Sequence, residues 1–230
     1  MENRYFIESA VLNKKELKLK AKRKNDNVET YLYDQKNEND YRIIFFKTIN
    51  DGLYKELMKS LNIFIEKYNI NKTLIVGLGN SMVIADSLGP KTTSKIMATN
   101  HYNDFLTIPK IALFNPEVVE KTGIMSYDLI KLVVNEIKPE CIIIIDSLAT
   151  SNIDNLNKCI EINDSGIIPG FYLKDNKEIN SNTFNIPVIS IGTPTIYLYK
   201  EKYLTTGAIN QYIDEMSELI AKAINTIFIH

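Results

Sequence analysis

Two aspartates stand where an apolar run ends, and they are the first candidates for chemistry in this sequence. Asp86 comes after the run Thr73–Val76 and a glycine loop, and Asp146 directly follows the run Cys141–Ile145. Neighbouring parallel strands lie roughly 4.8 Å apart, so carboxylates beyond two such strands can face one water molecule. Like charges that close resist double ionisation, so the pair would divide into an acid and a base. The pair would also suit a divalent cation, and Asp86 alone could instead cap a helix.

The loop before Asp86 has the sequence GLGN, from Gly77 to Asn80. The third glycine of a dinucleotide-binding loop is missing, and so is the Gly-Lys-Ser/Thr of a phosphate-binding loop. Backbone amides and an asparagine next to a reacting group can position a substrate or stabilise an oxyanion. We therefore assign Gly77, Gly79 and Asn80 to substrate binding or oxyanion stabilisation.

The composition excludes several classes of function. Lys+Arg 27 against Asp+Glu 28 leaves a net charge of −1, which argues against a nucleic-acid partner. No apolar run approaches the ~20 residues that span a bilayer, and no signal peptide opens the chain, so we expect a cytoplasmic protein without a membrane partner. Cys141 and Cys159 lie among apolar residues, as in a reducing compartment. Two histidines disfavour a metal site or a Ser-His-Asp triad, and no cofactor is expected.

Apolar runs and helical patterns alternate along most of the chain. The predicted strands of the core are Thr73–Val76, Lys110–Phe114, Cys141–Ile145 and Pro187–Ile191. The predicted helices are Asp51–Tyr68, Ser87–Thr99, Ser126–Ile137 and Asn210–Phe228, and residues 147–180 are expected to be less regular. This alternation predicts an α/β fold, with a mostly parallel sheet and helices on both faces.

The first 50 residues differ from the rest. Val28–Tyr33 and Tyr41–Thr48 are expected to form a hairpin or edge sheet. A basic run from Lys14 to Lys24 precedes them; it would form a solvated edge strand or contact an acidic partner. We interpret the chain as a single α/β domain, residues 1–230, in which residues 1–50 are a β-rich extension of the core 51–230.

Several segments, in order, resemble the germination protease of spore-forming bacteria. The segments that carry the resemblance are Leu74–Pro90 (LIVGLGNSMVIADSLGP), Thr122–Pro139 (TGIMSYDLIKLVVNEIKP), Ile144–Leu148 (IIDSL), Asn157–Gly170 (NKCIEINDSGIIPG), Pro187–Thr195 (PVISIGTPT) and Thr205–His230. The chain resembles a shortened member, because the last segment is joined directly where the family usually carries a long additional stretch.

The resemblance implies an endopeptidase that cleaves small acid-soluble spore proteins in the spore core during germination. It implies an aspartic-type mechanism with two essential aspartates, which fall on Asp86 and Asp146. It also implies a zymogen, a homotetramer and a fold similar to that of hydrogenase maturation peptidases.

The sequence departs from the family pattern near these aspartates. Ile84-Ala85 replaces the usual Thr-Pro, Ile168 stands where the family has histidine, and the arginine after the second aspartate is replaced within Thr150-Ser151-Asn152. These departures leave two alternatives open. One is a catalytically inactive or differently tasked binding protein, and the other is a metal-dependent variant with oxygen ligands.

Overall fold

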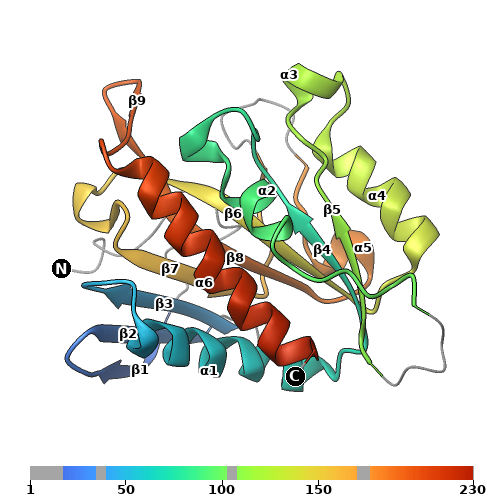
Figure 1. The fold of residues 1–230 in the computed structure, drawn as a ribbon, viewed down its shortest axis with the longest axis horizontal. Coiled ribbons are helices and arrows are strands. Elements are labelled where there is room, and N and C mark those ends of the chain that lie inside the picture. Colours follow the sequence, from blue (N-terminus) through green and yellow to red (C-terminus); the bar gives the residue numbers. More distant parts are fainter. Residues whose placement is uncertain (1–17, 35–39, 103–107, 170–176, 230) are drawn as a thin grey trace.

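The computed structural model describes residues 18–34, 40–102, 108–169 and 177–229 (Figure 1). Its strands are β1 (Lys18–Lys24), β2 (Val28–Asp34), β3 (Asp40–Phe46), β4 (Lys72–Gly77), β5 (Lys110–Phe114), β6 (Cys141–Thr150), β7 (Cys159–Asn163), β8 (Val188–Tyr199) and β9 (Lys202–Leu204). Its helices are α1 (Asp51–Tyr68), α2 (Leu88–Thr93), α3 (Val119–Thr122), α4 (Ser126–Ile137), α5 (Ser181–Phe184) and α6 (Ile209–Ile229). Two 3₁₀ turns are η1 (Ile84–Asp86) and η2 (Ile153–Asn155).

All of these strands belong to one sheet, in the order β1-β2-β3-β7-β8-β6-β4-β5, with β9 paired to β8. The strands β8, β6, β4 and β5 run parallel, as the sequence predicts. From β1 to β8 the pairs are antiparallel. The α/β class and the β-rich N-terminal strands are confirmed. The sheet as a whole is mixed, because the N-terminal hairpin joins the parallel strands through β7.

Helices cover both faces of the sheet, as predicted. Figure 1 shows α6 (red) crossing one face beside α1 and α2. Apolar side chains of α1 and α6, such as Leu57 and Ile220, share a buried core with Ile143 of β6. On the other face Ile130 of α4 is fully buried in a second core with Ile144. Burial on both faces explains the continuous apolar run of β6.

Helix α1 shows how local sequence sets these elements. The Asn50 side chain accepts hydrogen bonds from the backbone N–H groups of Gly52 and Leu53, which caps the helix. Leucines at helical spacing point into the core, and the helix ends at Tyr68, followed by the capping residue Asn69 in the left-handed conformation. The predicted range Asp51–Tyr68 is confirmed.

Three predicted element ends are wrong, those of β6, α2 and β8. The strand expected over Pro187–Ile191 continues to Tyr199 as β8, because β6, β7 and β9 pair with it. β6 continues beyond Ile145 to Thr150, so Asp146 lies inside the strand, because β8 pairs with β6 along this whole length. The helix expected over Ser87–Thr99 ends at Thr93, because the backbone N–H groups of Lys95 and Ile96 bond to carbonyl groups three residues back, in turns, and not four residues back as in an α-helix.

The segment expected to be irregular contains β7, the strand that joins the N-terminal hairpin to the core. Its partners are β3 on one side and β8 on the other. By contrast, the edge-strand interpretation of the basic run is confirmed for Lys18–Lys24, since β1 lies at the end of the sheet. Residues 14–17 of that run lie outside the described residues.

The buried carboxylate of Asp164 connects β3 and β7 to α1. Asp164 accepts hydrogen bonds from Lys67 Nζ at 2.8 Å, Tyr68 Oη at 2.6 Å and the backbone N–H of Asp40 at 2.7 Å. The Asp164 side chain is fully buried. Because a buried charge is tolerated only when it is paired, this cluster fixes β3, β7 and α1 relative to one another.

Candidate active site

A cavity of about 510 Å³ lies at the carboxyl-terminal ends of the parallel strands β4 and β6. This is the edge at which α/β sheets place ligands. Its lining combines three carboxylates with mostly apolar walls: Leu78, Gly79, Asn80, Val83, Asp86, Val118, Val119, Glu120, Met125, Ser126, Tyr127, Asp146, Ser147, Ala149, Ile168, Pro169, Lys177, Ile196 and Tyr203. Asp86 and Asp146, which the sequence predicts to meet, therefore face the same space.

The glycine loop holds Asp86 in place. The backbone N–H of Asn80 donates to Asp86 Oδ2 at 2.8 Å. Gly79 has a φ of +112°, and a Cβ atom there would overlap the carbonyl oxygen of Asp86. Only glycine allows this close approach of the loop to the 3₁₀ turn.

Burial is the main cause of an altered pKa at Asp86. Desolvation favours the neutral acid, the Asn80 N–H opposes this, and the charges of Glu117 and Glu120 add to the rise. Together they raise the pKa of Asp86 to about 6. The carboxyl is therefore poised to change its charge near neutral pH.

Asp146 is more deeply buried, with 8% of its surface exposed. Its Oδ1 accepts a hydrogen bond from the backbone N–H of Ser147 at 2.8 Å. Burial first, and the charge of Asp86 second, raise the pKa of Asp146 well above its ordinary value. The two carboxyls therefore lie in unequal environments: Asp146 is the more buried of the two, and the charge of Asp86 further disfavours its ionised form.

Contacts of α2 connect the two aspartates. The backbone N–H of Leu88 donates to Ser147 Oγ at 3.3 Å, so the residue after Asp146 holds the helix that follows Asp86. Gly89 packs so tightly that a Cβ atom would lie 2.5 Å from the carbonyl oxygen of Ile145. The start of α2 is therefore fixed directly on β6.

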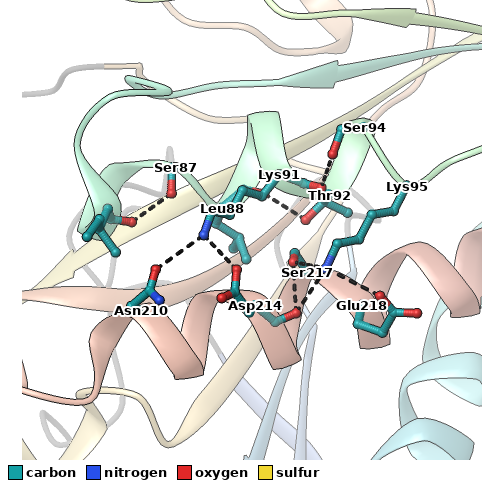
Figure 2. A network of polar contacts seen from close by, with 11 residues as sticks. Ser87, Leu88, Lys91, Thr92, Ser94, Lys95, Asn210, Asp214, Ser217 and Glu218 are labelled. Carbon is teal, nitrogen blue, oxygen red and sulfur yellow. Dashed lines mark hydrogen bonds and ion pairs between the residues drawn. The ribbon is translucent and has the colours of Figure 1, made fainter.

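A polar network holds α2 on α6 from the other side (Figure 2). Lys91 Nζ lies 2.6 Å from Asp214 Oδ1, and Lys95 Nζ lies 2.8 Å from Ser217 Oγ and 3.3 Å from Glu218 Oε2. The four charged side chains are partly or largely exposed, so each ion pair adds little to stability. Their arrangement sets the position of α2 and hence of the turn that carries Asp86.

The structure separates the three predicted loop residues. Gly79 and Asn80 line the cavity, whereas Gly77 does not. A Cβ atom at Gly77 would lie 2.5 Å from Asn115 Oδ1 and from the carbonyl oxygen of Gly89, so its contacts are packing contacts. In Asn80 the backbone N–H binds Asp86 and Oδ1 accepts from the Met82 N–H, while Nδ2 has no partner among the described residues.

Other parts of the wall were not singled out from the sequence. Glu120 comes from α3, and Tyr203 comes from β9. Their presence depends on how α3 and the β8–β9 hairpin fold over the sheet edge. An acidic residue at Glu120 was visible in the sequence, but nothing nearby marked it as a neighbour of Asp86.

The described residues contain no group of three or more His, Cys, Asp or Glu that could hold a metal ion. In the same part of the chain, no helix is both long and apolar enough to span a membrane.

Comparison with known proteins decides the family. A sequence profile described as "Germination protease" matches residues 46–200. The chain belongs to the germination protease family. A germination protease from Clostridium tetani is 34% identical over 184 residues, which cover 75% of this chain and 56% of that protein. One from Geobacillus sp. is 40% identical over 151 residues, or 60% of this chain and 40% of that protein.

This germination protease family member spans about half the length, or less, of the curated relatives that it matches. Among solved structures, the crystal structure of a NiFe hydrogenase maturation protease HycI from Thermococcus kodakarensis is similar, with a TM-score of 0.46 and 15% sequence identity. The likeness covers 70% of this chain and 99% of that one.

The positions that differ from the germination protease pattern fall in different environments. Ile84 is 46% exposed, and the carbonyl group of Ala85 accepts a hydrogen bond from Thr195 Oγ1 at 2.6 Å. The side chains of Ile84 and Ala85 are apolar, so neither can hydrogen-bond to the Asp86 carboxylate. Ile168, by contrast, lines the cavity itself. Gly170, Phe171 and Tyr172 of the same motif lie outside the described residues.

Proposed function

We propose that this chain is an endopeptidase of the germination protease type, which cleaves small acid-soluble spore proteins during germination. The observation that carries the proposal is the convergence of Asp86 and Asp146, from two separate family-like motifs, on one cavity. The pKa of both carboxyls is raised, and the charge of Asp86 adds to the rise at the more buried Asp146, which supports an acid–base pair. The mechanism needs no cofactor or metal ion.

In the proposed mechanism Asp86 is the general base and Asp146 the general acid. Ionised Asp86 takes a proton from a water molecule, whose oxygen forms a bond to the scissile carbonyl carbon. Protonated Asp146 gives its proton to the leaving amide nitrogen as the C–N bond breaks. The products are a carboxylic acid and an amine, and a proton returns from Asp86 to Asp146 for the next cycle.

The glycine loop has two roles in this mechanism. Its Asn80 backbone amide holds the base, and the Asn80 Nδ2 group is available to donate to the oxyanion. Gly79 permits the close approach, and Gly77 acts indirectly through packing. The apolar walls of the cavity would exclude water around the scissile bond, which strengthens such hydrogen bonds.

Membership of the family supports a proposal for the cellular setting of this activity. We propose that the substrate is a spore protein in the cytoplasm of the spore core, with no nucleic-acid or membrane partner. We also propose that the chain is made as a zymogen and assembles as a homotetramer. Its mass in solution, measured by light scattering, tests the assembly independently of activity.

Cleavage by purified protein tests the proposal. The chain is incubated with a small acid-soluble spore protein near pH 6.5, beside Asp86→Asn, Asp146→Asn and the control Asp154→Asn. Asp154 is exposed and lies outside the cavity lining. We expect mass spectrometry to find the same peptides from the wild type and the control, and none from the other two variants. Equal cleavage by all four proteins would contradict the dyad.

A second candidate is a binding protein without peptidase activity. It is favoured by Ile168, which lines the cavity where the family-like motif would have histidine. It predicts saturable binding of a spore protein, measured by calorimetry, without peptide products after long incubation. Turnover by the wild type that is lost in Asp86→Asn excludes it.

A further inference from the structure

Glu117 has an unusual backbone conformation beside the cavity. Its φ is +60°, in the left-handed region that residues with a Cβ atom rarely adopt. Other non-glycine residues of the described ranges with positive φ have local reasons: Asn69, Lys138 and Asn185 end helices, Lys200 and Glu201 form the β8–β9 turn, and Asn157 is an asparagine. Glu117 precedes α3 and has none of these reasons. A strained backbone conformation of this kind persists only where surrounding contacts hold the residue in it.

Hydrogen bonds to the carboxylate and to the backbone carbonyl group of Glu117 hold the residue in this conformation. Its carboxylate Oε2 accepts from the backbone N–H of Ser81 at 3.2 Å and from Lys121 Nζ at 2.9 Å. Lys121 Nζ also donates to Ser81 Oγ at 3.1 Å. At the other end the Ser126 hydroxyl donates to the Glu117 carbonyl oxygen at 2.9 Å. The residue is held between the glycine loop, α3 and the start of α4.

The chain of contacts leads directly to Asp86. Ser81 follows Asn80, whose own N–H binds Asp86 Oδ2 at 2.8 Å. Two successive amides of this loop are therefore each bound by a carboxylate, one in the proposed dyad and one outside it. A loop released at Ser81 would be free to turn the Asn80 amide away from Asp86.

We propose that Glu117, held by Lys121, is a positioning residue that keeps the loop after β4 in the conformation in which the Asn80 amide binds Asp86. This inference deepens the proposed function and rests on it for its kinetic consequences. The hydrogen bond by which Glu117 holds the Ser81 amide, called the clamp below, can be tested without peptidase activity.

The charge of Glu117 also acts on Asp86. It is one of the two outer carboxylates that contribute to the raised pKa of Asp86. The charged groups on the elements around Asp86 are Asp146 on β6, Glu117, Glu120 and Lys121 at α3, Lys177 across the cavity, and the Lys91–Asp214 pair between α2 and α6. Lys121 offsets part of the Glu117 charge, so its effect on Asp86 is partial.

Two substitutions separate geometry from charge. Glu117→Gly removes the clamp and relieves the backbone, since glycine adopts positive φ without a steric penalty. Glu117→Gln keeps a side-chain acceptor for Ser81 but removes the charge. Matched controls lie at the opposite end of the strands. Lys138→Gly relieves the same backbone conformation, and Glu140→Gln changes a carboxylate that accepts from the amides of Asn71 and Lys72.

Hydrogen exchange and carboxyl NMR are the first readouts, because neither needs activity. We expect Glu117→Gly to be at least as stable as the wild type while the Ser81 amide exchanges roughly tenfold faster or more. In Glu117→Gln the carbon resonance of the Asp86 carboxyl should titrate about half a pH unit lower, a roughly threefold change in ionisation constant. Neither control should alter either readout.

The kinetic readout follows. We expect kcat of Glu117→Gly to fall by roughly tenfold to a hundredfold with little change in KM, because the base is misplaced. Glu117→Gln should keep most of kcat and move the acid limb of the pH profile downward. Wild-type exchange at Ser81 and wild-type kcat in Glu117→Gly would overturn the inference. If Glu117→Gly does not fold, wild-type exchange at the Ser81 amide in Glu117→Asn, a residue that also tolerates positive φ but has a shorter side chain, overturns it. If the wild type cleaves nothing but the exchange and NMR changes occur, the clamp stands and the proposed function falls.

Discussion

Replacing Asp86 by asparagine should stabilise the protein at neutral pH while it abolishes cleavage. The folded protein raises the pKa of this carboxyl from its ordinary value of 3.8 to about 6. Below pH ~4 the group is protonated in both the folded and the unfolded chain, so it costs no stability. Between these values only the unfolded chain releases the proton, and the folded state loses stability. Above pH ~6 the full cost of the ionised carboxylate is present.

The size of this effect follows from the two values. A separation of about two pH units corresponds to about 3 kcal/mol at 1.36 kcal/mol per unit. Asp86 keeps partial exposure to water, which reduces the expected gain to about 1–2 kcal/mol. The asparagine retains an oxygen to accept from the Asn80 N–H, so little is lost in exchange. For a chain of this length such a gain raises Tm by roughly 2–8 °C.

Thermal unfolding at several pH values, followed by circular dichroism, measures this prediction. The Tm of Asp86→Asn should exceed that of the wild type at pH 7.5 and approach it near pH 4. The control Asp154→Asn should follow the wild type throughout. A variant that is strongly destabilised at pH 7.5 would refute the reasoning, because Asp86 would then be a stabilising partner rather than a strained base.

Three further predictions concern the surroundings. Asp146→Asn should abolish cleavage with a neutral-pH Tm equal to or slightly above that of the wild type, because burial and the charge of Asp86 disfavour the ionised carboxylate in the folded protein; a large loss of Tm would show a structural role. Gly79→Ala should cost roughly 1–3 kcal/mol of unfolding free energy and most activity, since its Cβ overlaps the Asp86 carbonyl group, whereas Gly207→Ala, which meets nothing within 4 Å, should be neutral in urea titrations. Asp164→Asn should lose roughly 2–4 kcal/mol in the same titration, because it leaves Lys67 without its buried partner, while Tyr68→Phe should lose about 1 kcal/mol; equal losses would mean that charge is unimportant there.

Local signals predicted the long elements well. α1 has leucines at helical spacing and an asparagine at its start, and both act as expected in the structure. The run from Cys141 to Ile145 is buried on both faces, as a continuous apolar strand requires. These features depend on near neighbours, so the sequence carries them directly.

The errors arose where distant segments decide the structure. β6 continues through Asp146 to Thr150 because β8 lies alongside it, although polar residues interrupt the apolar run. β7 has only five residues, Cys159–Asn163, and its pairing with β3 spans more than 100 residues. Short strands such as this one are set by their partners rather than by propensity.

The site was predictable in its centre and not at its rim. Asp86 and Asp146 could be paired because each follows an apolar run and parallel strands bring such positions together. Gly77 was assigned to the same site from the loop pattern, yet its surroundings are Gly89 and Asn115. Glu117 gave no sequence signal, since its role depends on a left-handed backbone and on Lys121 one helical turn away.

The dependence of kcat/KM on pH, measured with a small acid-soluble spore protein as substrate, tests the central claim most directly. The account predicts a bell-shaped profile. Its lower limb lies near pH 6, where Asp86 ionises in the folded protein, and its upper limb lies where Asp146 loses its proton; both limbs belong to the coupled pair. Cleavage that continues undiminished to pH 4, well below the raised pKa of Asp86, would contradict it.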